Sequence, residues 1–394
     1  MPAPAFVWVT HHVAATRWLK AELRRTAPHL TFAFARPGLT TFRVDGSRAP
    51  EDRTPSARVP SSFARAFGLS LGRATTAAEV MALVSATTAA TTAATTAAAT
   101  ATAANATPAA TTAPAANAAP GETANAASAA PLRLHVFERD LDVPADEQDR
   151  GVAGTRAAAV EAELRALGGA AFLAEPRAAP GDLVLDVVVP HAAEPQEPWL
   201  VGLHRHDAHH GPSPGGVGYV QPPPESPSRA YSKIEEALRW ANLEPAPGEL
   251  AVEIGSAPGG ATLALLQRGL TVYGVDPGEM HPVTRDFVGP HGNRLIHLHM
   301  PAAEVARSNL PRKFQWLLLD VNLAPMVALR YVERFVALAH GGLRGAVLTL
   351  KLNDDGIFEA LPRLLERVRK LGAATLRTTQ LPSHRSEVVA ILTW

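Results

Sequence analysis

The chain has 394 residues and no cysteine, and its 37 Lys and Arg residues balance 37 Asp and Glu residues. This length predicts two or three domains, and the lack of thiols excludes disulfides, thiolate metal sites and cysteine nucleophiles. Because the net charge is zero, affinity for nucleic acid has to be argued from local charge. The first residues lack the apolar core of a secretory signal, and no run approaches the ~18 apolar residues of a membrane-spanning helix, so we expect a cytoplasmic protein.

Residues 1–75 predict a small, basic α+β module. Apolar residues alternate as in strands over 6–10, 30–34 and 40–44, and residues 12–26 have the spacing of an amphipathic helix. Eleven basic residues against four acidic ones give this block a net charge of +7. Two interpretations stay open, namely an Arg-rich solvated surface and a face that contacts phosphates.

Residues 76–130 are rich in Ala and Thr, and no charged residue occurs between Val80 and Gly121. Alanine favours helix but buries little surface, the stiff Thr pairs oppose helix, and several prolines interrupt it. We predict a disordered linker, with loosely formed helix as the alternative. Such a linker would let residues 1–75 move relative to the rest of the chain, so that their loss need not disturb the fold of residues 131–394.

Residues 131–205 predict a second α+β module, with a helix over 154–167 and two neighbouring strands at 182–190 and 198–204. A connector rich in Gly, Pro and His follows at residues 206–228. The module and the connector contain a cluster of candidate metal ligands, which are His204, His206, Asp207, His209 and His210. Their crowded spacing, followed at once by Gly and Pro, favours a polar loop, so we predict no metal site.

From residue 229 to 394, helices alternate with strands that are almost wholly apolar, such as FQWLLLD and AVLTLKL. This pattern is typical of a buried, mostly parallel sheet covered by helices on both faces. The predicted fold class of this domain is therefore α/β, with a doubly wound sheet. Ligands of such sheets bind beyond the carboxyl ends of the strands.

A glycine-rich turn, VEIGSAPGGAT, stands at the end of the first strand of this sheet. Gly255 permits a tight turn, and Gly259 with Gly260 would let the backbone approach a ligand at the start of the next helix. The spacing matches neither GxGxxG nor GxxxxGK[ST], which argues against dinucleotides and against an NTPase. Asp276 ends the second strand, where an acidic side chain can bind ribose hydroxyls. We predict a nucleoside-containing cofactor, bound by Gly255, Ala257, Pro258, Gly259, Gly260, Asp276 and Asp320.

Further strand ends carry Asp320, Lys351 and Glu387, and the helix before the glycine turn carries Lys233. A lysine within an apolar strand needs partners or a lowered pKa, since burial of an unpaired ammonium is costly. Two lysines and two acids on one side of the sheet predict a closed network that orients one amine and tunes its proton affinity.

The order of Lys233, GSAPGG, Asp320, Lys351 and Glu387 resembles the Lys-Asp-Lys-Glu tetrad of the FtsJ-like S-adenosylmethionine-dependent RNA ribose 2'-O-methyltransferases. The stretches PSRAYSKIEEAL, VDPG, DVNLAP, LKLN and HRSEVV are similar to those of the RlmM-type 23S rRNA cytidine 2'-O-methyltransferases. The resemblance is strong over residues 205–394, moderate over 131–204 and suggestive over 1–75.

This resemblance implies a Rossmann-like methyltransferase domain preceded by ferredoxin-like or THUMP-like RNA-binding modules. It implies S-adenosylmethionine as cofactor, and RNA as partner, from 23S rRNA or a precursor particle. Lys351 would be the general base, held by Asp320, Glu387 and Lys233, and no metal would be required.

The sequence departs from these relatives at several positions. They usually have an acidic residue after the third strand, in contact with adenine, where this chain has Met300 and Pro301. The contact would then come from the backbone or from His299. Ala261 replaces a bulkier residue, and Ala230 stands near the position of an expected serine that helps to bind the cofactor.

Two other functions remain open on the sequence. A methyltransferase acting on a base, a protein or a small molecule would have no use for the two lysines. A non-catalytic RNA-binding or ribosome-assembly protein with a decayed cofactor pocket would explain the missing acid near Pro301. A titration with the cofactor distinguishes the second of these from an enzyme.

Overall fold

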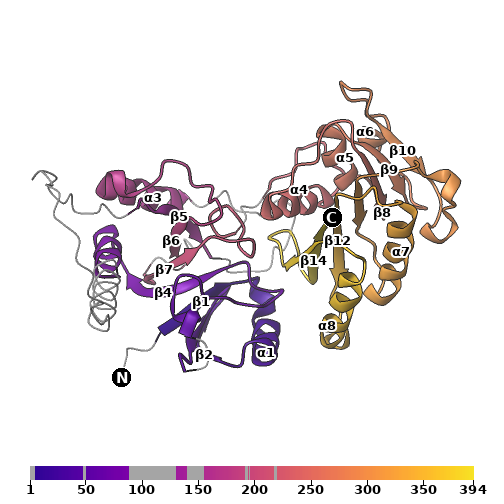
Figure 1. Ribbon diagram of the computed structural model, residues 1–394. Helices are drawn as coiled ribbons and strands as arrows, with labels where there is room; N and C mark the ends of the chain where they lie inside the picture. Colours follow the sequence, from indigo (N-terminus) through magenta and orange to yellow (C-terminus); the bar gives the residue numbers. More distant parts are fainter. Residues whose placement is uncertain are drawn as a thin grey trace, which may run out of the picture.

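The computed structural model describes residues 5–47, 50–87, 130–139, 155–190, 194, 196–216 and 220–394. Most of the segment predicted as a linker, residues 88–129, lies outside these ranges. The described residues form two domains, each built on a seven-stranded sheet (Figure 1). No helix among them is both long enough and apolar enough to cross a bilayer.

The N-terminal domain has the strand order β2-β3-β1-β4-β7-β6-β5. Its strands are β1 (Ala5–Thr10), β2 (Leu30–Arg36), β3 (Leu39–Val44), β4 (Ala66–Ala74), β5 (Arg133–Glu138), β6 (Leu183–Val189) and β7 (Trp199–Arg205). The predicted helices and the predicted neighbouring strands of both modules are present. They are α1 (Thr16–Thr26), α3 (Thr155–Gly168) and the antiparallel pair β6 and β7.

The two predicted modules, residues 1–75 and 131–205, belong to one sheet. β4 pairs with β7 in antiparallel register from Leu69 opposite Leu203 to Ala74 opposite Trp199, so both modules share one hydrogen-bonded sheet. Each of these two strands would otherwise expose an unpaired edge. The start of the predicted linker is also ordered, since residues 77–87 are helical and bury Ala77 and Val80 against the second half of the sheet.

The C-terminal domain has the strand order β10-β9-β8-β11-β12-β14-β13. Its strands are β8 (Leu250–Ile254), β9 (Thr271–Val275), β10 (Leu295–Leu298), β11 (Trp316–Leu319), β12 (Gly345–Lys351), β13 (Thr375–Thr379) and β14 (Glu387–Thr393). β8 to β12 are parallel, and β14 runs antiparallel between β12 and β13. The predicted doubly wound sheet is confirmed, and its order reverses between β8 and β11, where such folds bind ligands.

Helices cover both faces of this sheet, as the apolar strand sequences predict. They are α4 (Ala230–Ala241), α5 (Gly260–Gln267), α6 (Pro282–Arg285), α7 (Pro325–Leu338) and α8 (Asp355–Arg369). Leu317 and Leu319 of β11 point into the core formed with α7 and α8, whereas Leu318 points into the core formed with α4 and α5. This alternation is the two-residue period of a strand buried on both faces.

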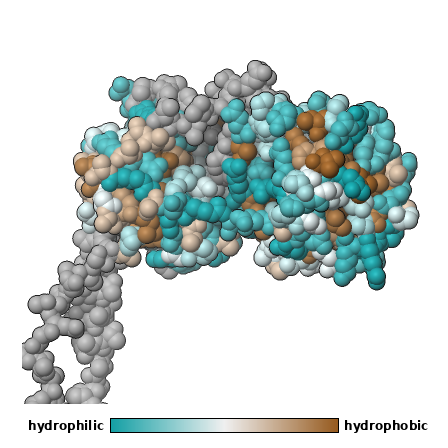
Figure 2. Space-filling model, turned by 90° about the horizontal axis from the view of Figure 1, so that it is seen from above, coloured by the Kyte–Doolittle hydropathy of each residue, from teal (hydrophilic) through white to brown (hydrophobic). Residues whose placement is uncertain are grey.

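The two domains pack directly against each other. Trp18 of α1 stacks on Phe358 of α8 with 5.7 Å between ring centroids, and Phe63 lies 5.8 Å from the same ring. Thr379 Oγ1 donates a hydrogen bond of 3.1 Å to the carbonyl oxygen of Ala64. The prediction that residues 1–75 move freely relative to the rest of the chain is therefore wrong, because they contact the C-terminal domain. On the face of the molecule seen in Figure 2, apolar residues lie in small groups between hydrophilic ones.

Candidate active site

The four residues of the predicted tetrad come from four elements that meet at the carboxyl edge of the parallel strands. Asp320 follows β11, and Lys351 ends the neighbouring parallel strand β12. Because β14 is antiparallel to β12, its first residue, Glu387, lies directly opposite Lys351. Lys233 reaches the same point from the first turns of α4. The topology thus brings together residues that are up to 154 positions apart.

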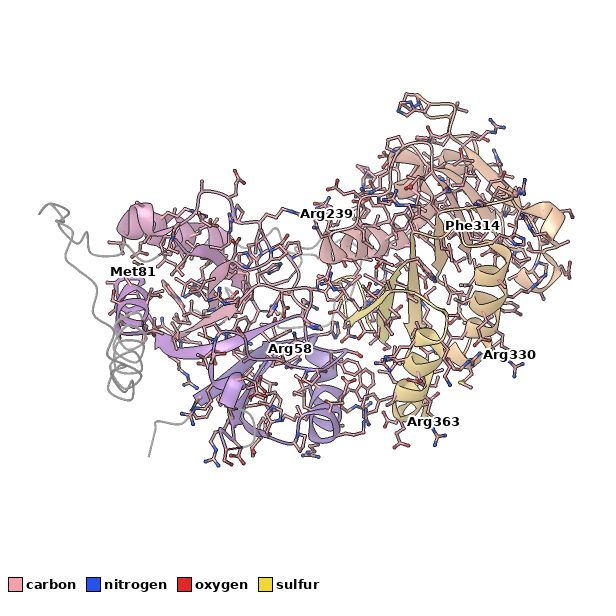
Figure 3. The ribbon with its side chains drawn as sticks, viewed as in Figure 1. Arg58, Met81, Arg239, Phe314, Arg330 and Arg363 are labelled. Atoms are coloured by element: carbon pink, nitrogen blue, oxygen red, sulfur yellow. The ribbon has the colours of Figure 1, made fainter. Side chains whose placement is uncertain are left out.

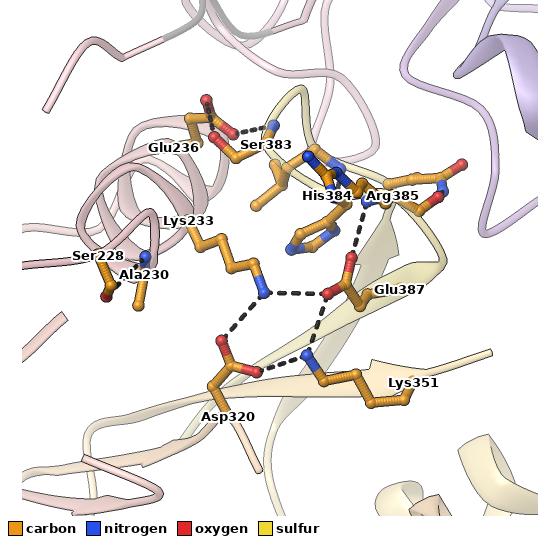
Figure 4. Close-up of polar contacts among 12 residues, drawn as sticks. Ser228, Ala230, Lys233, Glu236, Asp320, Lys351, Ser383, His384, Arg385 and Glu387 are labelled. Carbon is orange, nitrogen blue, oxygen red and sulfur yellow. Dashed lines mark hydrogen bonds and ion pairs between the residues drawn. The ribbon is translucent and has the colours of Figure 1, made fainter. Parts of the chain in front are cut away.

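The four side chains form a closed ring of ion pairs (Figure 4). Lys233 Nζ lies 3.1 Å from Asp320 Oδ2 and 3.0 Å from Glu387 Oε1. Lys351 Nζ lies 3.0 Å from Asp320 Oδ1 and 3.0 Å from Glu387 Oε1. All four side chains are between 11% and 21% exposed, so water screens these pairs poorly.

The ion pairs of the ring favour the charged forms of Lys351 and Glu387. Burial by itself lowers the pKa of Lys351, but the carboxylates of Asp320 and Glu387 outweigh it and hold this pKa above its ordinary value. Burial raises the pKa of Glu387, yet His384, Lys233 and Lys351 together bring it well below its usual range. The resting site therefore contains two ammonium groups and two carboxylates, with no net charge.

A second set of contacts, which the sequence did not reveal, fixes the ring to the protein. Glu236, buried on α4 three residues after Lys233, accepts hydrogen bonds from Ser383 N at 2.9 Å and from Ser383 Oγ at 2.7 Å. The backbone N–H of Arg385 donates to Glu387 Oε2 at 2.7 Å. The loop before β14 is thus tied to the helix that carries Lys233, which sets the distance between Lys233 and Glu387.

A cavity of 680 Å³ opens beside the ring, and this is a usual size for a site that holds a small ligand. Of the predicted site residues, those that line it are Lys233, Gly255, Ala257, Asp276, Asp320 and Lys351. Glu387 completes the ring through its ion pairs with both lysines, but it is not among the described residues that line the cavity. The cavity is therefore at the place where the sequence predicted the cofactor.

Pro258, Gly259 and Gly260, by contrast, are absent from the described lining of this cavity. A Cβ on Gly260 would stand 2.3 Å from Ser228 Oγ, so this glycine allows the segment before α4 to pack against α5. At Gly255, where φ is +87°, a Cβ would stand 2.3 Å from the carbonyl oxygen of Asp320. Close approach of protein segments therefore requires both glycines.

Asp276 connects the two strand ends that form the floor of the cavity. Its Oδ1 accepts a 2.7 Å hydrogen bond from the N–H of Gly278, and its Oδ2 accepts one of 3.2 Å from the N–H of Ala257. Each carboxylate oxygen has a second lone pair. The side chain can therefore still accept hydrogen bonds from a ligand in the cavity.

Several lining residues were missed by the reasoning from sequence. Ser228 lies two residues before Ala230, where a hydroxyl was expected, and it lines the cavity. Ser256, next to Gly255, is buried, and among the described residues its hydroxyl finds no hydrogen-bond partner. Pro301 also lines the cavity, whereas His299 bonds through Nε2 to the carbonyl oxygen of Pro277 at 2.7 Å. The serines in these turns were the available signal.

The histidines predicted to form a polar loop differ from that prediction. His204 belongs to β7, and His204, His206 and His210 are each at most 5% exposed. His209 alone among the four is on the surface. Packing of β7 within the shared sheet buries them, and this packing depends on the pairing with β4 that the sequence did not predict.

A mostly parallel sheet of this order, with a cavity over a glycine-rich turn at its carboxyl edge, defines the C-terminal domain as a Rossmann-like methyltransferase fold. The sequence model of the family described as FtsJ-like methyltransferase matches residues 227–333. The resemblance to this family is thereby confirmed over these residues.

Curated relatives are named ribosomal RNA large subunit methyltransferase M. The one from Halorhodospira halophila is 34% identical over 179 residues, which are 44% of this chain and 49% of the relative. The one from Laribacter hongkongensis is 34% identical over 198 residues, covering 46% and 52%. The chain thus matches about half the length of these relatives. A solved structure of magnesium protoporphyrin IX methyltransferase from Synechocystis PCC 6803 covers 42% of this chain and 79% of its own, at 18% identity and a TM-score of 0.31.

Proposed function

We propose that this protein is an S-adenosylmethionine-dependent methyltransferase that methylates a ribose 2'-hydroxyl in RNA, with 23S rRNA as the substrate class. The observation that carries the proposal is the closed ring of Lys233, Asp320, Lys351 and Glu387 at the wall of the cavity. A methyl transfer to a hydroxyl needs a base beside the acceptor oxygen, and Lys351 Nζ is held there by two carboxylates.

The residues around the cavity fit the cofactor. Asp276, which lines the cavity, offers carboxylate oxygens to ribose hydroxyls. When bound, S-adenosylmethionine supplies a methyl group that its positively charged sulfur already activates. The protein then has to position the acceptor oxygen and take up its proton.

Lys351 can accept that proton only as a neutral amine, while the resting ring keeps it protonated. The site releases this proton more easily when another positive charge occupies the cavity, since like charges disfavour each other's charged form. Two unit charges 4 Å apart repel by about 4 kcal/mol at an effective dielectric constant of 20. The neutral amine would then take the proton of the 2'-hydroxyl, and the bound cofactor would supply the methyl group to the oxygen. Lys351 is then an ammonium again, stabilised by Asp320 and Glu387.

The N-terminal domain would hold the RNA, and we retain the proposal that it contains a THUMP-like module. Residues 1–75 have a net charge of +7. Phe32 on β2 is 48% exposed, and Lys20 Nζ lies 3.6 Å from the centroid of its ring. An exposed aromatic ring beside a cation suits base stacking and phosphate contact in single-stranded RNA.

The non-catalytic alternative has one observation in its favour. Pro301, which stands where an acidic residue was expected, lines the cavity together with Ala302, and neither has a polar side chain. This alternative requires that S-adenosylmethionine bind very weakly or not at all.

The deciding experiment combines cofactor binding with the chemistry of the product. The full chain is titrated with S-adenosylmethionine by calorimetry and then incubated with labelled cofactor and rRNA from cells that lack the protein. Nuclease digestion and mass spectrometry locate the methyl group. We expect a ribose-methylated nucleoside. Methyl groups on bases would refute the proposed acceptor, and absence of both binding and transfer would favour the non-catalytic alternative.

A further inference from the structure

Three buried histidines lie together at the end of β7, outside the proposed active site. His204 is 3%, His206 5% and His210 5% exposed. One ring nitrogen from each lies within 4.8 Å of the corresponding atoms of the other two. Three imidazoles that converge at one buried point are unusual, because histidine is polar at both ends of its ring and is seldom gathered in a core.

One ring nitrogen of each histidine is unsatisfied. His204 Nε2, His206 Nδ1 and His210 Nε2 are buried and have no hydrogen-bond partner among the residues that the structure describes. Native proteins leave few buried polar atoms unpaired, and those that remain call for an unseen ion or water. Three such atoms in one cluster therefore indicate a ligand that binds to all three.

In two of these histidines, the other ring nitrogen contacts a carboxylate oxygen. His204 Nδ1 is 2.6 Å from Asp186 Oδ2, and His210 Nδ1 is 2.9 Å from Asp207 Oδ1. A carboxylate on Nδ1 orients the ring and leaves the lone pair of Nε2 free, which is the usual outer contact of a metal-binding histidine.

We propose that His204, His206 and His210 bind a divalent transition metal ion, with Zn²⁺ as the best match. Imidazole nitrogen suits zinc, copper, iron and nickel, whereas magnesium and calcium select oxygen ligands. Zinc is the choice among these because it needs no redox partner and accepts three histidines with a fourth position open. The prediction that this segment contains no metal site is replaced by this proposal.

The position of the cluster assigns the ion a structural role. The ring of His210 packs against the tilted ring of Phe67 on β4, with 4.3 Å between their centroids. Its carbonyl oxygen accepts a 3.1 Å hydrogen bond from Arg377 on β13, and the guanidinium of Arg377 lies 4.1 Å from the centroid of the Trp240 ring on α4. An ion bound here would join β7 to the connector at the point where the connector meets the C-terminal domain.

The protein provides its own matched control in His209. This residue lies within the same segment, but it is exposed, and its Nε2 is 3.0 Å from Nη1 of Arg58. Arg58 belongs to the N-terminal domain and is labelled in Figure 3. Its replacement changes the number of histidines in the segment without removing one of the three proposed ligands.

The test measures metal content and affinity in the full-length protein. The wild type, His206→Ala and His209→Ala are stripped with a chelator and titrated with Zn²⁺ in competition with an indicator dye, and with Co²⁺ by visible absorption. We expect about one ion per chain for the wild type and for His209→Ala. Loss of an outer-shell contact lowers metal affinity ~10–100-fold. We expect the affinity of His206→Ala for Zn²⁺ to fall by more than that.

Asp186→Asn, which changes the partner of His204, should fall in that ~10–100-fold range. In the wild type and in His209→Ala, saturating Zn²⁺ should raise the midpoint of thermal unfolding. The affinity of both proteins for S-adenosylmethionine should stay the same. Equal binding by His206→Ala and His209→Ala would overturn the proposal. So would a wild type that takes up less than a tenth of an equivalent, a result that does not depend on whether any variant folds.

Discussion

Replacing Lys351 by alanine is the sharpest test of the proposed chemistry. The variant removes one of two ammonium groups from the ring, while Lys233 keeps its contacts of 3.1 Å and 3.0 Å with Asp320 and Glu387. The remaining side chains thus stay paired, and the net charge of the ring changes from zero to −1. We therefore expect the domain to fold and the cavity to keep its shape.

The expected loss lies in the chemical step. A positioned general base contributes typically ~10²–10⁴-fold, which corresponds to about 2.7–5.5 kcal/mol in the activation free energy. Affinity for the positively charged cofactor should be unchanged or slightly higher, because the site becomes more negative. Loss of an interaction made only in the transition state appears in kcat, and much less in KM.

The assay follows single-turnover methyl transfer from labelled S-adenosylmethionine to rRNA, together with calorimetric binding of the cofactor. Lys370→Ala is the matched control, since this lysine is exposed at the end of α8 and absent from the cavity lining. A decrease in rate of less than tenfold for Lys351→Ala would refute its role as base. A loss of cofactor affinity as large as the loss of rate would show that the residue binds the cofactor instead.

Three further predictions follow from the same geometry. Because its ring partners raise the pKa of Lys351, the transfer rate should increase with pH up to that pKa and level off above it. This dependence on pH should disappear in Lys351→Ala, and a wild-type rate that falls with rising pH would contradict the prediction. Asp276→Ala should weaken cofactor binding measured by calorimetry, whereas the exposed Asp286→Ala should not; unchanged affinity would show that the nucleoside is misplaced. Lys20→Ala should reduce the slope of log affinity against log salt by about 0.7 for single-stranded RNA, and an unaltered slope would mean that this basic face is only solvated.

Deleting residues 1–75 is no longer a clean test of RNA binding. The deletion would remove β1 to β4, expose the edge of β7 and uncover Phe358, so loss of RNA affinity would be confounded with loss of structure. Single substitutions on the exposed face of β2 avoid this problem, because Phe32 is half exposed and outside the described hydrophobic core.

The sequence by itself determined most of the secondary structure of the C-terminal domain and the position of its cavity. Near-continuous apolar runs predicted parallel strands buried on both faces, and turns with Gly255 and Asp276 marked the carboxyl ends of two of them. These signals are local, since each depends on residues within one strand and the turn that follows it. The four members of the tetrad could be predicted because each stands at or near the end of an element.

Only the tertiary structure decided which strands pair and which side chains become buried. Insertion of β14 between β12 and β13 places Glu387 opposite Lys351, and the pairing of β4 with β7 merges two modules into one sheet. That merged sheet buries His204 and brings Phe67 against His210. The two-residue period of a strand shows which of its faces is apolar. The backbone N–H and C=O groups along its edges, however, are chemically alike for every partner strand. The partner is selected by long-range packing, which no local spacing in the sequence records.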